Sequence, residues 1–427
     1  MPGPTQKTGK IRAAFSRVPL LGWLLGIFAA VMLEKFIGTD LALGVGLPKI
    51  PALFGIDIML KKPLLVPNAF LYTLLIYALP IVAVAVASAS LANRAAAVLI
   101  RLPIAVPVAV HLGLFYLSMH FWAEVSDYRA LVLKLTLIAI MLTLSLNVIN
   151  GYMGEFSCSH PGFMALGAYC ASVVTVGLFV DGGMFGITLL PESMGPFLFP
   201  LALIAGGLTA AAGALFVAVP SFRTRGDYLA IISLAFLFIV KSLIENFEFV
   251  RGPRGMSGQP DWAGLFTVFL WTVICVWSIN NFVRSTLGKA LNAVRDNELA
   301  ASAMTVDTRR TKMIGFLFAA FWAGVAGGLF AHVLRYVNPG TFGIQNLAEV
   351  LAMVYFGGLN SVYGSIVGAV SISMLGEALR PLEIFKWIII PLLLILVMIY
   401  RPTGLVAFKD LDAASLLRPK QRPGGEE

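Results

Sequence analysis

The sequence has few of the residues on which most enzymes and metal-binding proteins depend. Among its 427 residues are only three cysteines and four histidines, and charged residues make up 12%. Cys158, Cys170 and Cys275 lie in or beside apolar runs, at spacings that match no metal site, and are interpreted as small core residues. The histidines form no ligand pair, and no catalytic constellation is visible. We therefore expect no metal, no cofactor and no enzymatic reaction in this chain.

A phosphate-binding loop is also missing. The pattern GxxxxGK[ST] does not occur, because Gly288-Lys289 lacks both the upstream glycine and the following Ser or Thr. If ATP drives any process that involves this protein, another chain must bind the nucleotide.

Apolar residues, in contrast, are abundant. They make up 59% of the chain, and the mean hydropathy is +0.87. A soluble domain cannot hide that much apolar surface. A helix needs roughly 20 apolar residues to cross a hydrocarbon layer of about 30 Å, and such runs recur here without the alternation of a barrel. The sequence predicts an all-α polytopic membrane protein with about 10–12 transmembrane helices.

The expected spans follow from the runs without charge. They lie near 18–33, 64–92, 95–122, 130–149, 161–180, 197–220, 228–243, 263–283, 313–337 and 387–400. Two shorter runs, 348–359 and 364–379, are joined by the sequence GGLNSVYG and could be two half-crossings or one broken element. The basic start followed by an apolar run imitates a signal peptide, but no cleavage site follows, so a retained first span is expected.

The basic residues predict an orientation. With the N-terminus inside and twelve crossings, the inner loops carry roughly twice as many Lys and Arg as the outer loops. This bias places both termini and the polar loop 284–312 in the cytoplasm, although four lysines in 34–63 argue weakly against it. The net charge of +9 is thereby explained without nucleic acid, for which no partner role is expected.

The polar loop 284–312 has the pattern of helices rather than of a flexible linker. Ser285 or Thr286 can cap a first helix, and Asp307 can cap the helix that continues into the membrane. Four apolar residues recur at spacings that place them on one side of a helix: Leu291, Val294, Ala301 and Met304. The loop is either a solvated connection or a docking surface for a cytoplasmic partner.

Six stretches, in order, resemble the LivM family, the permease subunits of ATP-binding-cassette importers for branched-chain amino acids. The resemblance covers roughly 130–410, and 1–110 resembles more loosely the extra N-terminal spans of longer members. The stretches are LTLSLNVINGYMGEFSCSHPGFMALGAY, RTRGDYLAIISLAF, RGPRGMSGQP, LGKALNAVRDNELAASAMTVD, VLAMVYFGGLNSVYGSIVGA and RPTGLV.

The resemblance implies a role for the polar loop. In such permeases a short helix of this loop inserts into a cleft on the ATPase subunit. The residues that match this coupling region are Arg295, Glu298, Ala300, Ala301, Thr305 and Asp307. Thr305 stands where the motif has glycine, and because Thr does not adopt a positive φ cheaply, the turn there is expected to differ in shape.

A polar group near a span boundary is the candidate translocation path: Asn147, Asn150, Glu155, Ser157, Ser159 and His160. Helix ends there could offer backbone groups to a carboxylate or an ammonium. Hydrogen bonding between helices is the alternative. Glu155 departs from the family, which commonly has Gln or an apolar residue there, and is either a substrate or gating residue or a solvated loop residue.

The resemblance also implies an organisation and partners. We expect extra spans over 1–110, a permease core over 111–405 and a disordered cytoplasmic tail over 406–427. The expected partners are two ATPase subunits, a second LivH-like permease, a periplasmic or extracellular substrate-binding protein and the lipid of a bacterial cytoplasmic membrane. Two alternatives stay open: a permease of this type for urea or short amides, and a gradient-driven secondary transporter, for which few paired intramembrane acids are present.

Overall fold

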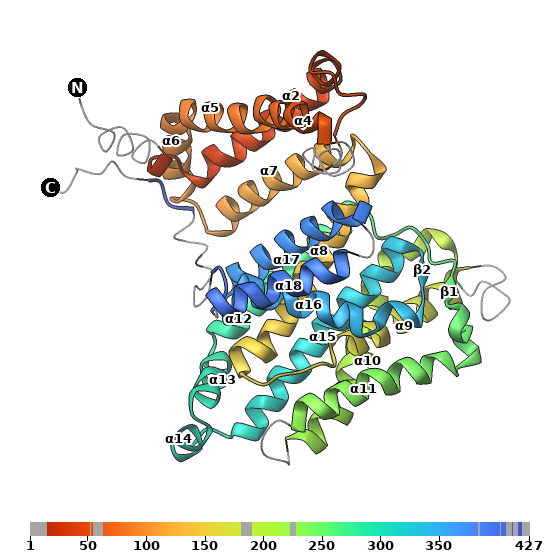
Figure 1. Cartoon of the computed structure of the whole chain (residues 1–427). Coiled ribbons are helices and arrows are strands. Elements are labelled where there is room, and N and C mark those ends of the chain that lie inside the picture. Colours follow the sequence, from red (N-terminus) through yellow and green to blue (C-terminus); the bar gives the residue numbers. More distant parts are fainter. Residues whose placement is uncertain are drawn as a thin grey trace. The chain divides into compact units, whose positions relative to one another are not determined.

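The computed structural model describes residues 15–51, 53, 63–180, 190–222, 228–382, 385–401, 403–406, 412 and 417–420. These residues form helices almost throughout, as Figure 1 shows. They divide into two compact units, one of residues 1–133 with 412–427 and one of residues 134–411. The boundary falls within a single helix, α8 (Asp127–Asn147).

The first unit consists of apolar helices that precede α8. Their bounds are α2 Leu20–Gly44, α4 Val66–Thr73, α5 Leu79–Ala87, α6 Ala89–Leu99 and α7 Ala105–Ala123. A π-helical segment, Leu74–Ala78, joins α4 to α5 without a break. Helix α2 packs against both α5 and α7.

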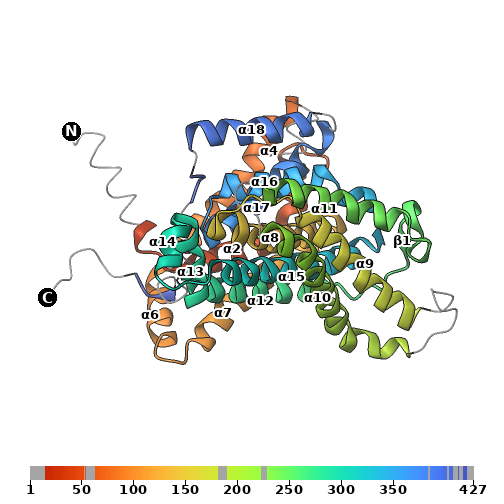
Figure 2. The same ribbon diagram turned by 90° about the horizontal axis from the view of Figure 1, so that it is seen from below.

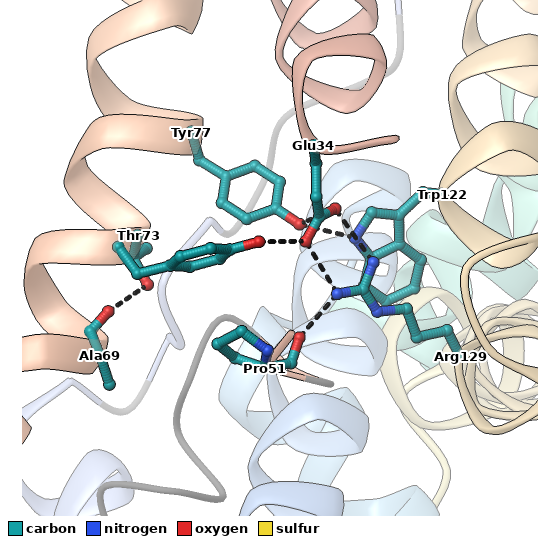
Figure 3. A network of polar contacts seen from close by, with 8 residues as sticks. Glu34, Pro51, Ala69, Thr73, Tyr77, Trp122 and Arg129 are labelled. Atoms are coloured by element: carbon teal, nitrogen blue, oxygen red, sulfur yellow. Dashed lines mark hydrogen bonds and ion pairs between the residues drawn. The ribbon is translucent and has the colours of Figure 1, made fainter. Parts of the chain in front are cut away.

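This unit contains a buried ion pair between Glu34 and Arg129 (Figure 3). The guanidinium of Arg129 donates from Nη1 to one carboxylate oxygen of Glu34 at 3.0 Å and from Nη2 to the other at 2.9 Å. The hydroxyl groups of Tyr72 and Tyr77 also donate to Glu34, and the Trp122 indole donates to Tyr77. Glu34 is 0% and Arg129 1% exposed, so the hydrogen bonds compensate two desolvated charges.

The second unit contains the longer helical core and one small hairpin. Its elements after α8 are α9 His160–Phe179, α10 Gly195–Ser221, α11 Tyr228–Glu245, β1 Met256–Ser257, α12 Leu265–Arg284, α13 Thr286–Asp296, α14 Glu298–Ala303, α15 Thr308–Leu334, β2 Tyr336–Val337, α16 Ile344–Gly357, α17 Val362–Ala378 and α18 Lys386–Tyr400. The strands β1 and β2 are antiparallel, with Met256 opposite Val337.

Glycines bring three helices of this unit into close contact. Helices α9, α10 and α15 pack against one another in every pair (Figure 1). A Cβ at Gly206 would lie 2.7 Å from the carbonyl oxygen of Gly167, and one at Gly324 would lie 2.8 Å from that of Gly206. Only glycine allows backbones to approach this closely, as in other membrane helix pairs.

The C-terminal helices form a second group, in which α16 and α17 pack as a hairpin with α18 beside them (Figure 2). The turn between α16 and α17 contains two residues with positive φ, Gly358 at 128° and Asn360 at 54°. Within the hairpin, a Cβ at Gly368 would lie 2.8 Å from the Cα of Gly357.

The all-α polytopic class expected from the sequence is confirmed. Within the described ranges, nine helices are long and apolar enough to cross a membrane, and Val362–Ala378 and Ile388–Tyr400 are shorter apolar helices. The expected span 95–122 was wrong as a single helix, because α6 ends at Leu99 and α7 begins at Ala105, with a turn at Pro103. Most of the predicted tail, 406–427, lies outside the described residues, as does 223–227 of one family-like stretch.

Candidate functional site

The polar loop between α12 and α15 is built from two short helices, each started by a side-chain cap. Ser285 accepts from the Gly288 amide and begins α13, as expected. Asn297 accepts from the Ala300 amide at 3.0 Å and begins α14. Asp307 accepts from the Arg310 amide at 3.0 Å and begins α15, which confirms its predicted role as a cap.

The apolar side of this loop is only partly as predicted. Leu291, Val294 and Ala301 are buried, and Leu291 packs on Gly315 of α15. Met304 was wrongly placed with them, because α14 ends at Ala303 and the side chain of Met304 is 76% exposed in the turn that follows. Leu299 is also 75% exposed, so the tip of the loop presents two large apolar side chains.

Thr305 contradicts the expectation that its turn would avoid a positive φ. Its φ is 66°, the left-handed value that the glycine of the motif would adopt. The reason is the hydrogen bonding that ends α14: the Val306 amide donates to the Ala301 carbonyl, and the Thr305 amide donates to the Ser302 carbonyl. These two bonds make a Schellman motif, which fixes the residue after the helix cap in the left-handed region. The turn keeps its shape, and Thr305 bears strain.

The second part of the site is the break between α8 and α9. Helix α8 continues as a π-helical segment, Val148–Met153, which ends at Gly154 with a φ of 74°. Residues 154–159 then run without regular structure until α9 begins at His160. π-helical turns interrupt the regular hydrogen-bond ladder and often occur at functional positions.

Asn147 joins the start of the break to the turn between α16 and α17. Its side-chain amide donates to the Ser361 carbonyl at 3.0 Å and to the Ser365 hydroxyl at 2.7 Å, and its oxygen accepts from the Asn360 amide at 3.1 Å. Gly151 is needed beneath it, because a Cβ there would lie 2.6 Å from the Asn360 nitrogen. Asn147 is thus fully hydrogen-bonded between helices, as the structural alternative proposed.

The remaining polar side chains of the candidate path are buried close to one another at the break. The Asn150 oxygen accepts from the Ser157 amide at 3.2 Å, and the hydroxyl groups of Ser157 and Ser159 lie 2.8 Å apart. The His160 imidazole is 0% exposed, and neither ring nitrogen has a hydrogen-bond partner of normal geometry, although the Ser145 backbone lies near the ring. This group is therefore a buried cluster of side chains that can donate and accept hydrogen bonds.

Glu155 also lies in the break, and its side chain contacts the polar loop. The ammonium of Lys312, in the second turn of α15, lies 2.7 Å from a Glu155 oxygen and 2.9 Å from a Glu298 oxygen. The side chain of Lys312 is 11% exposed, that of Glu155 25% and that of Glu298 52%. The sequence analysis did not predict a role for Lys312. The available signal was its position at the start of an apolar helix, because a buried lysine needs a carboxylate partner.

Arg295 makes a second contact between the polar loop and the break. Its Nη1 donates to the Gly151 carbonyl at 3.2 Å, and its side chain lies directly over Gly154, where a Cβ would collide with Arg295 Cγ. Arg295 also pairs with Asp296 at 2.8 Å. Of the predicted coupling residues, Ala301 is buried, whereas Ala300 and Asp307 are exposed.

In the parts of the chain that the structure describes, no three His, Cys, Asp or Glu side chains are grouped as ligands. The site consists of the polar loop and the break between α8 and α9. An ion pair and a hydrogen bond connect the two.

Comparison with known proteins identifies the family. The model of the family described as "Branched-chain amino acid transport system / permease component" matches residues 128–399. The chain belongs to this family. The permease is similar to the LivM protein of Escherichia coli K12, a high-affinity branched-chain amino acid transport system permease protein, with 32% identity over 310 residues, which cover 64% of this chain and 68% of that protein.

Other similar proteins are also named as branched-chain amino acid transport system permeases. LivM of Salmonella typhimurium is 31% identical over the same shares of both chains. The LivH permease of Escherichia coli K12 is 23% identical over 293 residues, covering 64% of the permease and 92% of LivH. No solved structure matches the permease. The predicted resemblance to the LivM family is confirmed, and the chain is a multi-pass transport subunit rather than an enzyme.

Proposed function

We propose that this permease carries leucine, isoleucine and valine inward across a bacterial cytoplasmic membrane, driven by ATP that separate subunits hydrolyse. The observation that carries the proposal is the polar loop: a capped helix, α14, that presents Glu298 and the exposed Leu299 and Met304 at its tip. A short helix with exposed apolar side chains suits a groove on a partner. The matched relatives are named as branched-chain amino acid permeases, which supports the substrate class.

The partners follow from the same reasoning. The sequence contains no GxxxxGK[ST] loop, so ATP must be bound by other chains, and we propose two ATPase subunits, of which one receives α14. The similarity to both LivM and LivH supports a second, LivH-like permease beside this one. A substrate-binding protein on the outer side completes the proposed importer, and residues 1–110 are proposed as an N-terminal addition to the permease core 111–405.

The substrate chemistry favours a mostly apolar path with a few dipoles. A branched-chain amino acid is a zwitterion with an apolar side chain, so strong fixed charges would hold it too tightly. We propose that the path passes the break, where the candidate residues are Asn147, Asn150, Ser157, Ser159 and His160. The first turn of α9 has no side-chain cap, and the buried His160 ring lies at its start, so both can meet a carboxylate.

The proposal is tested by isolation of the native assembly and a transport assay. Tagged permease is extracted gently from its own membranes, and the proteins that accompany it are identified. We expect ATPase subunits and a second permease, and ATP-dependent leucine uptake when the assembly is placed in vesicles with its binding protein. A permease that emerges alone and moves its substrate on an ion gradient would show a secondary transporter, and uptake of urea or acetamide but not leucine would correct the substrate.

A further inference from the structure

The ammonium of Lys312 is shared by carboxylates from two separate segments of the chain. Glu298 begins α14 at the tip of the polar loop, and Glu155 lies in the break between α8 and α9, directly after Gly154. Both lie within hydrogen-bond distance of the same nitrogen atom, at 2.9 Å and 2.7 Å. Since Lys312 is 11% exposed, water screens these ion pairs less than it would at an open surface. The two acidic groups would repel each other without the lysine between them.

Arg295 attaches the same segment at a second point. It donates to the Gly151 carbonyl at 3.2 Å, and its aliphatic part covers Gly154. Lys312 and Arg295 lie on opposite sides of α14 in the sequence, at the start of α15 and the end of α13. The five residues from Gly151 to Glu155 are therefore held by the helices on both sides of the proposed docking helix.

The far side of this segment has little room to absorb a displacement. Gly151 lies against Asn147 and against the Asn360 nitrogen, and the Ser157 amide is bonded to Asn150. The segment itself can change, because a π-helical turn is one residue away from regular α-helical pairing. A shift of the polar loop would therefore change the backbone conformation of the π-helical turn.

We propose that Lys312, with Arg295, transmits the movement of α14 to the π-helical turn 148–153 and so opens the buried polar group at Ser157–His160. The inference rests on the proposed function and deepens it by naming the residues that connect the docking helix to the path. Lys312 is a positioning residue, which acts through Glu155 and does not touch the substrate. The coupling is an internal linkage of this chain, separate from the contact of α14 with an ATPase.

The test is hydrogen–deuterium exchange on the whole purified assembly, with and without a non-hydrolysed ATP analogue. In the unaltered protein, exchange is expected to change in both 286–303 and 148–159 when the nucleotide binds. In Lys312→Met, the change in 286–303 should persist while that in 148–159 is lost, and leucine uptake per ATP hydrolysed should fall at least tenfold. Lys312→Arg should restore both. Glu155→Gln removes the same link with a smaller change in the chain and should reproduce the uncoupling.

Lys386→Met is the matched control, because Lys386 forms a similar half-buried pair with Glu349 at 2.8 Å in the same unit. It should leave both exchange responses and the uptake ratio unchanged. The inference is overturned if 148–159 responds to nucleotide equally in Lys312→Met, Glu155→Gln and the unaltered protein, or if only 286–303 responds in the unaltered protein. If 286–303 itself does not respond to nucleotide, the proposed function fails together with the inference, and that result is distinct from the other two.

Discussion

The side chain of Arg295 lies across Gly154, at a position that any Cβ on residue 154 would occupy. The two residues are far apart in the sequence, one in the polar loop and one at the end of the π-helical turn, and Gly154 also has a φ of 74°. Two separate constraints, a left-handed backbone and a covering side chain, thus require glycine at this place.

Gly154→Ala tests this contact. The left-handed backbone costs a side chain about 1–2 kcal/mol, and displacement of Arg295 adds to that cost. We expect a lower thermal midpoint in detergent and reduced leucine uptake. Adding Arg295→Ala should partly restore the midpoint, because the clash is relieved, but not the uptake, because Arg295 belongs to the proposed linkage. Gly113→Ala is the control, since a Cβ there meets nothing within 4 Å and stands inside α7. Equal midpoints and uptake for the two glycine variants would contradict the packing described.

Thr305→Gly should stabilise the polar loop. Thr305 has a φ of 66°, and glycine removes a strain of about 1 kcal/mol. The expected result is slower amide exchange over residues 298–306. Ser302→Gly, inside α14 and with ordinary helical geometry, is expected to accelerate exchange in the same segment because glycine weakens a helix by roughly 0.5–1 kcal/mol. Acceleration by both variants would refute the strain at Thr305.

The ion pair of Glu34 and Arg129 predicts a non-additive pair of mutations. Glu34→Leu or Arg129→Met alone leaves one buried charge uncompensated and should cost about 3–5 kcal/mol of unfolding free energy. The double variant removes both charges, so its loss should be smaller than either single loss. The measurement is thermal or denaturant unfolding in detergent. A double variant with the summed losses of the two single variants would show that the pair is not a unit.

Glu298→Arg should leave the permease inserted in the membrane but impair its coupling to the ATPase. The reversal places a second cation beside Lys312, whose distance to Glu298 is 2.9 Å, and changes the charge of the docking tip. We expect normal expression, weaker ATPase co-purification and low uptake. Glu192→Arg reverses another exposed charge, in the segment before α10, and should have no effect. Normal ATPase association and normal uptake in Glu298→Arg would remove the docking interpretation.

Cys158 is a native reporter of the break. Burial raises the pKa of its thiol, so at neutral pH less of the reactive thiolate is present than in a free cysteine, and the thiolate appears only at higher pH. In a Cys170→Ala/Cys275→Ala background, a polar maleimide should label Cys158 slowly in the resting permease and faster as the pH rises. Labelling should accelerate during turnover. A resting rate equal to that of the denatured chain would contradict the burial.

The sequence predicted the helical class and much of the polar loop, because both depend on local patterns. A long apolar run is itself the span that it predicts, and the caps Ser285 and Asp307 directly precede the helices that they begin. Thr305 was misjudged because the hydrogen bonds of Val306 and Thr305 at the end of α14 outweighed the residue's own preference. The end of α14 at Ala303 likewise separated Met304 from the apolar stripe that its spacing predicted.

The connection through Lys312 could not be predicted from local sequence. Glu155 and Lys312 are 157 positions apart, and the break and the polar loop meet only once α8, α13 and α15 are packed. The sequence showed Glu155 as an unusual carboxylate near a span end and offered either a substrate role or solvation. The structure shows a third role, an ion pair with Lys312 at the start of α15.

The glycine contacts of α9, α10 and α15 carry a consequence for where the permease can change shape. Backbones that touch without intervening side chains have few alternative packings, and a slide along such an interface would bring larger residues into collision. These three helices should therefore move as one rigid body during transport. Deformation is left to the elements around them, above all the π-helical turn 148–153, so the fold separates a stiff frame from the place where it can bend.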